Sequence, residues 1–207
     1  MTDLGFVHRF VPATGDRPPL LMLHGTGGDE DDLVPLGTAL APGAALLSPR
    51  GQVRENGMPR FFRRLAEGVF DVEDLAARTD ELAGFLAKAR EAYGIGKPVA
   101  VGFSNGANIA WSLLLRHPQA LAGAVLMRAM MPFRPRPAGR LDGVPVLLLS
   151  GSADAMSPPK QRDDLAEVLR GAGADLTHHV LPAGHGLTQE DVDLAAAWLG
   201  SRPPQQR

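Results

Sequence analysis

One serine of the chain lies in a short pattern typical of a nucleophile. Residues 102–106 read Gly-Phe-Ser-Asn-Gly, directly after an apolar run and directly before a helical pattern. Such a pattern at a strand–turn–helix junction holds the serine hydroxyl at the edge of a parallel sheet, and its glycines allow the tight turn. A helix that begins beside the hydroxyl favours negative charge developing there. Ser104 is therefore a candidate nucleophile for acyl transfer, and a glycine-rich turn with an unused serine is the alternative.

A nucleophilic serine needs a general base, and His185 is the histidine best placed to act as one. It follows the last predicted strand in a glycine-flanked loop, whereas His178 and His179 fall inside that strand. A ring inside the strand is more typical of a packed or solvent-facing histidine. His185 is therefore the candidate base.

A carboxylate completes the set of residue types. Asp154 comes just after the apolar run 144–149, and open parallel sheets build their sites at this end of a strand. The chain order is then Ser104, Asp154 and His185, which differs from the orders in the two well-known serine protease folds. An ordinary aspartate in a turn is the alternative for Asp154.

A second glycine-rich loop follows an earlier predicted strand. Residues 24–28 read His-Gly-Thr-Gly-Gly, and a tetrahedral intermediate needs two fixed N–H donors of the kind such a loop supplies. We expect the backbone N–H groups of Thr26 and Asn105 to form this oxyanion hole. A dinucleotide-binding loop would need its third glycine at the position of Glu30, so that interpretation fails. His24 is expected to pack structurally beneath the loop.

The elements that must position these residues are predicted by an alternation of short apolar and longer amphipathic runs. This alternation is typical of an α/β protein with a mostly parallel central sheet of about seven strands and helices on both faces. The predicted strands are residues 6–11, 20–23, 44–48, 99–103, 123–127, 144–149 and 176–181. The predicted helices are residues 31–41, 72–93, 107–116, 160–171 and 188–199. Residues 50–70 and 131–143 fit neither pattern, and residues 131–143 are expected to be irregular.

Length and composition limit the possible classes of protein. The 207 residues fit one domain, which we expect over residues 1–200, with a flexible tail over residues 201–207. The net charge of −2 argues against nucleic acid or an anionic membrane as the partner. The absence of cysteine excludes disulfides, thiolate metal sites and cysteine nucleophiles.

Targeting signals are not evident in the sequence. The first residues show no basic stretch followed by an apolar one. No apolar run approaches the roughly 20 residues that span a bilayer. We therefore expect a cytoplasmic protein with no membrane span.

The motifs together resemble those of the α/β-hydrolase superfamily. The chain is similar to its phospholipase/carboxylesterase branch, which includes acyl-protein thioesterases, in residues 24–27, 102–106, 151–154 and 184–186. Residues 48–62 also resemble bacterial hydroquinone-stress carboxylesterases. The resemblance covers residues from about position 20 to 199.

This resemblance implies a fold and a reaction. It implies an α/β-hydrolase fold and hydrolysis of short to medium acyl esters through an acyl-enzyme on Ser104, Asp154 and His185. No metal and no cofactor is implied, and the expected partner is a small-molecule ester, with the protein a monomer or homodimer. Only residues 131–143 occupy the usual lid position, which implies an open, shallow pocket without a substantial cap domain.

Alternative functions stay open at this stage. A lysophospholipase or an acyl thioesterase would use the same three residues, although acyl-protein thioesterases usually carry glutamine where this chain has Asn105. A non-catalytic binding protein with an α/β-hydrolase fold is the alternative from another class. Fold and catalytic residues do not fix the substrate.

The substrate pocket is the least constrained part of the prediction. We expect its wall to come from residues 50–70 and 130–133, with further side chains beside the catalytic residues. Arg50 and Arg60 are candidates to contact an anionic group, with solvated surface as the alternative. The candidate lining residues, for most of which core packing is the alternative, are Met58, Phe61, Phe62, Met131, Met156 and Leu187.

Overall fold

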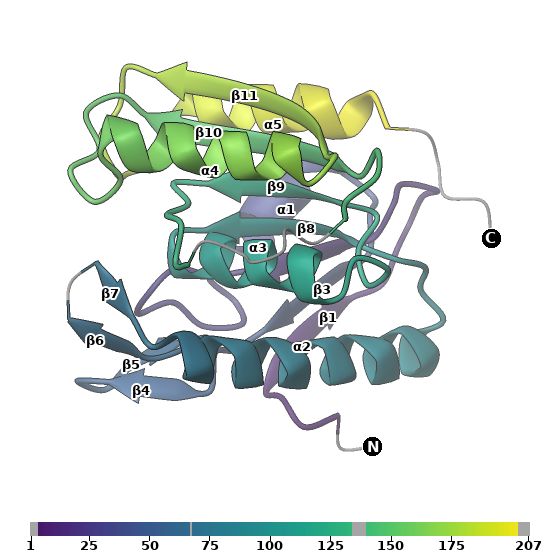
Figure 1. Ribbon diagram of the computed structural model, residues 1–207. Coiled ribbons are helices and arrows are strands. Elements are labelled where there is room, and N and C mark those ends of the chain that lie inside the picture. Colours follow the sequence, from purple (N-terminus) through teal and green to yellow (C-terminus); the bar gives the residue numbers. More distant parts are fainter. Residues whose placement is uncertain (1–3, 67, 134–139, 203–207) are drawn as a thin grey trace.

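A seven-stranded sheet runs through the protein in the order β1-β3-β2-β8-β9-β10-β11 (Figure 1). The computed structural model describes residues 4–66, 68–133 and 140–202. The strands of this sheet are β1 (His8–Val11), β2 (Leu20–Leu23), β3 (Leu46–Pro49), β8 (Val99–Phe103), β9 (Gly123–Met127), β10 (Pro145–Gly151) and β11 (Asp175–Leu181). β1 pairs antiparallel with β3, and the other neighbours pair parallel. The predicted mostly parallel sheet is confirmed.

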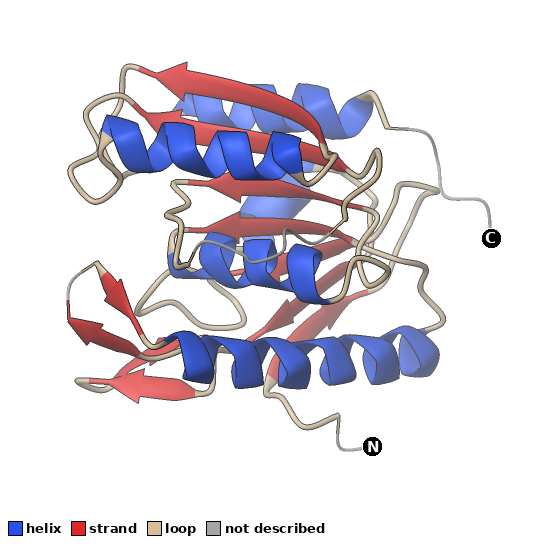
Figure 2. Cartoon of the chain, viewed as in Figure 1, coloured by secondary structure: helices blue, strands red, loops and turns tan. Residues whose placement is uncertain are grey.

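Helices cover both faces of the sheet, as Figure 2 shows. They are α1 (Val34–Leu40), α2 (Val72–Tyr93), α3 (Asn105–Arg116), α4 (Pro159–Gly171) and α5 (Gln189–Gly200). Side chains alternate across each strand, so Leu21 and Leu23 of β2 pack in the cluster that contains α2, α3 and α4. Leu20 and Met22 of the same strand pack in the other cluster, with α1 and α5. The sheet therefore has a hydrophobic core on each side, which makes a rigid base for the loops at its edge.

Two helix starts differ in how well the sequence predicted them. α5 begins within one residue of the predicted start at residue 188, and Thr188 caps it in a capping box, because its hydroxyl accepts from the Asp191 N–H and its own N–H donates to the Asp191 carboxylate. α1 begins at Val34 and not at residue 31. The Asp31 N–H donates to Asp29 Oδ1 at 3.0 Å, and this local turn competes with helix over the preceding residues.

Residues 50–70, which fit neither the helix nor the strand pattern in the sequence, contain regular structure. They form two small antiparallel pairs at one end of α2 (Figure 1), β4 (Val53–Glu55) with β5 (Met58–Arg60) and β6 (Arg64–Ala66) with β7 (Val69–Phe70). Asn56 and Gly57 join β4 to β5 with φ values of 50° and 81°. Asn-Gly is the preferred pair for such a two-residue hairpin turn, and this signal in the sequence was missed.

The described part of residues 131–143, namely 131–133 and 140–143, contains no helix or strand. Residues 134–139 lie outside the described residues, as do residues 203–207 of the predicted tail. Of the helices that the structure describes, none is both long and apolar enough to cross a membrane.

Candidate active site

Ser104 occupies a strained turn between β8 and α3. Its φ is 53° and its ψ is −113°, a conformation that side-chain-bearing residues rarely adopt and that is found most often at functional sites. A Cβ on Gly102 would lie 2.6 Å from Gly106 O, and one on Gly106 would collide with Leu23 O. Both glycines are thus needed for the turn, for a steric reason that the sequence pattern implied.

The three candidate catalytic side chains lie in one hydrogen-bonded row. The Ser104 hydroxyl donates to His185 Nε2 at 2.9 Å, and His185 Nδ1 donates to Asp154 Oδ2 at 2.9 Å. They come from three loops at the carboxyl ends of β8, β10 and β11. The Asp154 side chain is fully buried, whereas 26% of the His185 side chain is exposed. The buried carboxylate fixes the imidazole with Nε2 as the acceptor for the serine proton.

The loop that carries Asp154 is held by its own hydrogen bonds. Asp154 Oδ1 accepts from the Met156 N–H at 2.9 Å. The Ser157 hydroxyl donates to Ala129 O at 3.2 Å, which ties this loop to the end of β9. Both carboxylate oxygens of Asp154 are therefore bonded, one to the backbone and one to His185.

Arg128, which the sequence analysis did not single out, holds the loop of His185. Its fully buried guanidinium donates to Gly184 O at 2.9 Å and to Gly186 O at 3.1 Å, on both sides of the histidine. It also forms a bidentate pair with buried Asp191, with two distances of 2.7 Å. Nothing near Arg128 in the sequence indicated this role, since Gly184, Gly186 and Asp191 are 56 or more residues away along the chain.

The two predicted oxyanion donors are available in the structure. The N–H groups of Thr26 and Asn105 make no hydrogen bond to any residue in the described ranges, and Asn105 is the first residue of α3, where helical N–H groups lack partners. The Thr26 loop is fixed by β5, because Gly27 N–H donates to Pro59 O at 3.0 Å and Arg60 Nη1 donates to Thr26 Oγ1 at 2.8 Å. A hydrogen-bonded loop of this kind can hold a donor in place for a developing oxyanion.

His24 packs beneath this loop, as expected. It is fully buried, its Nε2 accepts from the Gly51 N–H at 2.9 Å, and its Nδ1 donates to Gly25 O at 2.6 Å. The ring packs against Phe61 with 4.6 Å between the centroids. Burial lowers the pKa of His24 below its usual value of 6.5, so the ring stays neutral and joins the loop to the segment that follows β3.

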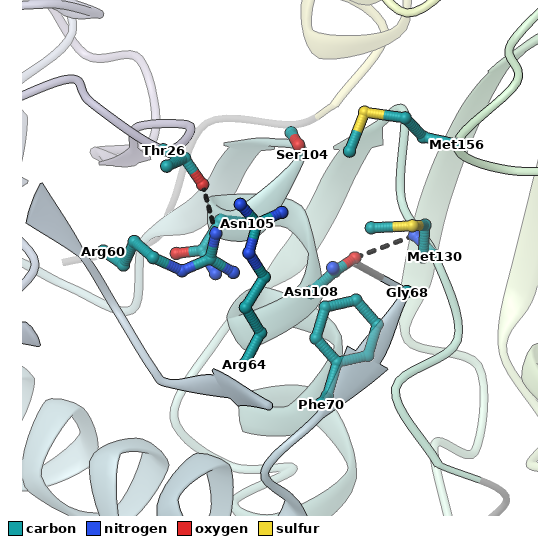
Figure 3. Close-up of a pocket in the computed structure, with 10 residues that line it drawn as sticks. All are labelled: Thr26, Arg60, Arg64, Gly68, Phe70, Ser104, Asn105, Asn108, Met130 and Met156. Atoms are coloured by element: carbon teal, nitrogen blue, oxygen red, sulfur yellow. Dashed lines mark hydrogen bonds between the residues drawn. The ribbon is translucent and has the colours of Figure 1, made fainter. Parts of the chain in front are cut away.

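A small cavity of about 20 Å³ opens beside Ser104 (Figure 3). A volume of about 10–15 Å³ is enough for one water molecule, so the cavity is narrow. Its lining residues are Thr26, Arg60, Arg64, Gly68, Phe70, Ser104, Asn105, Asn108, Met130 and Met156. The expected contribution of residues 50–70 to the wall is therefore present, through the candidate Arg60 and through Arg64, Gly68 and Phe70, which were not predicted.

The prediction that Phe61 and Phe62 line the pocket was wrong. They are 2% and 0% exposed and belong to the hydrophobic core. Phe62 packs against the ring of Phe70, with 5.5 Å between the centroids. Phe70, two strands later, is the aromatic residue that reaches the cavity.

Of the other four predicted lining residues, one lines the cavity and three do not. Met156 lines the cavity, whereas Met58, Met131 and Leu187 do not. Met58 is 40% exposed and lies over the Thr26 loop, with its sulfur 3.6 Å from the position of a Cβ on Gly27. Met131 and Leu187 pack at the edges of the two core clusters, which is the core-packing alternative.

The two arginines considered for an anionic group have different surroundings. Arg50 pairs with Glu30, with 2.7 Å between Nη2 and Oε1, and does not line the cavity. Arg60 is only 3% exposed, so solvated surface is the wrong interpretation for it. Arg64 and Asn108 were missed, although Asn108 lies three residues after Asn105, on the same side of a helix.

This arrangement can transfer an acyl group. A serine hydroxyl bonded to a neutral imidazole can lose its proton as it attacks a carbonyl. The buried carboxylate can stabilise the imidazolium that results. Two free N–H groups beside the serine can bind the oxyanion. Within the described residues, no cluster of three or more histidine, aspartate or glutamate side chains could hold a metal ion.

Comparison with known proteins connects this geometry to a family. The family described as alpha/beta hydrolase fold matches residues 18–139. The hydrolase MhqD of Bacillus subtilis is 44% identical over 193 residues, covering 92% of this chain and 96% of MhqD. A crystal structure of the Bacillus cereus carboxylesterase is also 44% identical, with a TM-score of 0.93 over 96% of this chain and 95% of that one. A carboxylesterase structure from Mesorhizobium loti is 31% identical, with a TM-score of 0.90 over 98% of each chain.

Proposed function

Since the chain belongs to the α/β-hydrolase fold family, we propose that it is a serine carboxylesterase that cleaves esters of short acids through an acyl-enzyme. The observation that carries the proposal is the row of hydrogen bonds from Asp154 through His185 to Ser104, next to two free N–H groups. The carboxylesterases of Bacillus cereus and Mesorhizobium loti share this fold over nearly the whole chain, which supports the same reaction.

The first half of the reaction forms the acyl-enzyme. Ser104 Oγ attacks the ester carbonyl while His185 Nε2 takes its proton. The oxyanion accepts hydrogen bonds from the N–H groups of Thr26 and Asn105. His185 then gives the proton to the leaving alcohol, and the bond between the acyl carbon and the alcohol oxygen breaks. Asp154 stabilises the imidazolium during these steps.

The second half returns the enzyme to its starting state. A water molecule takes the place of the alcohol and loses a proton to His185 as it attacks the acyl carbon. The bond to Ser104 Oγ breaks, the serine regains its proton, and the acid leaves. His185 is 26% exposed at its side chain, so water can reach the acyl carbon from its side.

The size of the cavity limits the acyl group. Phe70, Met130 and Met156 narrow the space beside Ser104 to about 20 Å³. So small a volume disfavours the long chains of a lysophospholipid or a lipidated protein. We therefore prefer a short-acyl esterase over a lysophospholipase or an acyl thioesterase.

A series of p-nitrophenyl esters tests the proposal. We expect the kcat/KM for the acetate and butyrate to exceed that for the octanoate and palmitate, and Ser104→Ala to abolish hydrolysis of all four. A maximum at octanoate or beyond would support the lysophospholipase or thioesterase alternative. Hydrolysis that survives Ser104→Ala would contradict the mechanism, and no hydrolysis at all would favour a non-catalytic binding protein.

A further inference from the structure

The cavity beside Ser104 is lined by an unusual excess of hydrogen-bond donors. Figure 3 shows the guanidinium groups of Arg60 and Arg64 and the side-chain amides of Asn105 and Asn108 at this cavity. Arg60, Asn105 and Asn108 are at most 3% exposed. Buried donors of this kind normally have acceptors within the protein.

The NH₂ groups of the two amides have no acceptor among the described residues. Asn105 Oδ1 accepts from the Phe61 N–H at 2.8 Å, and Asn108 Oδ1 accepts from the Met130 N–H at 2.8 Å. These two backbone donors fix which end of each amide is the oxygen, because an NH₂ group cannot accept from an N–H. Both Nδ2 atoms are then left buried without a hydrogen-bond partner among the described residues.

The two arginines bring more positive charge than their surroundings neutralise. Both pair with one carboxylate, that of Glu55, through Arg64 Nε at 2.7 Å and Arg60 Nε at 3.2 Å. No hydrogen bond joins Arg60 Nη2 or the terminal nitrogens of Arg64 to another described residue. None of the described lining residues is acidic. The pair therefore offers one net positive charge and free donors.

A ligand for this cavity must supply acceptor oxygens and negative charge in a small volume. A carboxylate does both, since its two oxygens accept several hydrogen bonds and pair with guanidinium groups. A neutral alkyl group would leave the amide donors unbonded. The cavity of about 20 Å³ favours a compact group over a bulky one.

The position of the cavity indicates which half of the ester would carry the carboxylate. The leaving alcohol must lie against His185, which protonates it, and His185 does not line the cavity. The residues that bind the carbonyl, namely Thr26, Ser104 and Asn105, do line it. The acyl half of the substrate therefore enters the cavity.

We propose that the preferred substrate is the half-ester of a short dicarboxylic acid, with its free carboxylate bound by Arg60, Arg64, Asn105 and Asn108. This inference rests on the proposed esterase function and names its substrate class. One water and one half-ester give one alcohol and one dicarboxylic acid. Only the acyl–oxygen bond breaks, and the free carboxylate does not react.

Three esters of similar size test the proposal. They are monoethyl succinate, its neutral amide counterpart ethyl succinamate, and O-butyrylglycolate, in which the carboxylate is on the alcohol half. We expect a kcat/KM for monoethyl succinate at least about tenfold above that for each of the other two esters. A hydrogen bond to a charged group contributes enough binding free energy for this difference. Equal values for the first two esters would overturn the proposal, and a preference for O-butyrylglycolate would overturn the assignment to the acyl half.

Variants at Arg64 separate binding from structural support. Arg64→Gln should lower the ratio of kcat/KM for monoethyl succinate to that for ethyl succinamate by about tenfold. Arg64→Lys, which keeps the charge, should recover part of the loss. Arg54→Gln is the matched control, because Arg54 is an exposed arginine of the neighbouring β4 that does not line the cavity. An equal fall on both substrates in Arg64→Gln, or the same selective fall in Arg54→Gln, would overturn the proposal.

A variant at a second residue tests the proposal if Arg64→Gln does not fold. Asn108→Asp keeps an acceptor for the Met130 N–H and replaces the free donor with a carboxylate oxygen. It should reduce the preference for monoethyl succinate over ethyl succinamate, and an unchanged preference would contradict the proposal.

Ser104→Ala distinguishes failure of the half-ester proposal from failure of the proposed esterase function. If wild type cleaves ethyl succinamate and this variant does not, the esterase function stands whatever the preference for the anion.

Discussion

At the scale of single residues, the proposed chemistry depends on a serine held in a conformation that most residues avoid. Ser104 has a φ of 53°, and the glycines two positions before and after it leave no room for a side chain. This turn was predicted from the sequence, because the steric need for its two glycines is local. The hydrogen bond that the Asn105 side chain accepts from the Phe61 N–H was not predicted, since Phe61 lies more than 40 residues earlier in the chain.

Asp154→Asn tests the role of the buried carboxylate. The amide keeps the size of the side chain but can donate to His185 Nδ1, which favours the tautomer with its proton on Nε2 and removes the acceptor for the serine. We expect kcat to fall by about 10³–10⁴, near the loss recorded for the equivalent change in a serine protease. Steady-state kinetics on p-nitrophenyl acetate measures it, with circular dichroism as the check on folding. A fall of less than tenfold would mean that Asp154 does not orient the base.

At the scale of elements, the site depends on segments that hold its loops from outside. The hairpin of β4 and β5 bonds to the Thr26 loop through Pro59 and Arg60. This hairpin could have been predicted from Asn56-Gly57, because that pair adopts the positive φ values of a two-residue turn. Its docking on the oxyanion loop could not, since nothing local in the sequence encodes the contact.

Arg128→Met tests the support of the His185 loop. The change removes bonds to Gly184 and Gly186 and leaves the buried Asp191 carboxylate without its positively charged partner. We expect the free energy of unfolding to fall by about 3–5 kcal/mol, measured by urea denaturation. At temperatures where the variant stays folded, kcat should fall because His185 is less firmly held.

The matched control for this loop is Arg116→Met, at an exposed arginine that pairs with Asp80. A surface pair of this kind contributes about 0–1 kcal/mol, and kcat should not change. Equal losses of stability in the two variants would contradict the role given to Arg128. An Arg128→Met enzyme with wild-type kcat would show that His185 is positioned without it.

At the scale of the whole molecule, the parallel sheet brings distant residues to one edge. Ser104, Asp154 and His185 follow β8, β10 and β11, which lie in one sheet with β9 between the first two. Their meeting could be predicted, because carboxyl ends of parallel strands share an edge. The lining of the cavity could not, as the choice between Phe62 in the core and Phe70 at the cavity is made by packing of the whole segment.

The stability of the whole molecule should depend on pH through two histidines, the buried His24 and the half-buried His178. Burial lowers the pKa of His24 and of His178 below 6.5, so protons bind the unfolded chain first as the pH falls. The free energy of unfolding is then highest above pH 6.5 and decreases as the pH falls through this value.

Urea denaturation between pH 7.5 and 5.5 measures this dependence. The double variant with His24→Gln and His178→Gln should show a smaller loss of stability over this range than wild type. Comparing the pH dependence of the two proteins removes the contribution of the other histidines. An equal or larger loss in the double variant would show that these two rings are not the source.

The most direct test of the central claim is to find the atom that becomes acylated. A p-nitrophenyl phosphate triester reacts with an activated serine nucleophile and leaves a stable adduct, which peptide mass spectrometry can locate. We predict one adduct per chain, on Ser104, formed far more slowly in His185→Ala. An adduct on another residue, or an active esterase that forms none, would contradict the mechanism proposed for this protein.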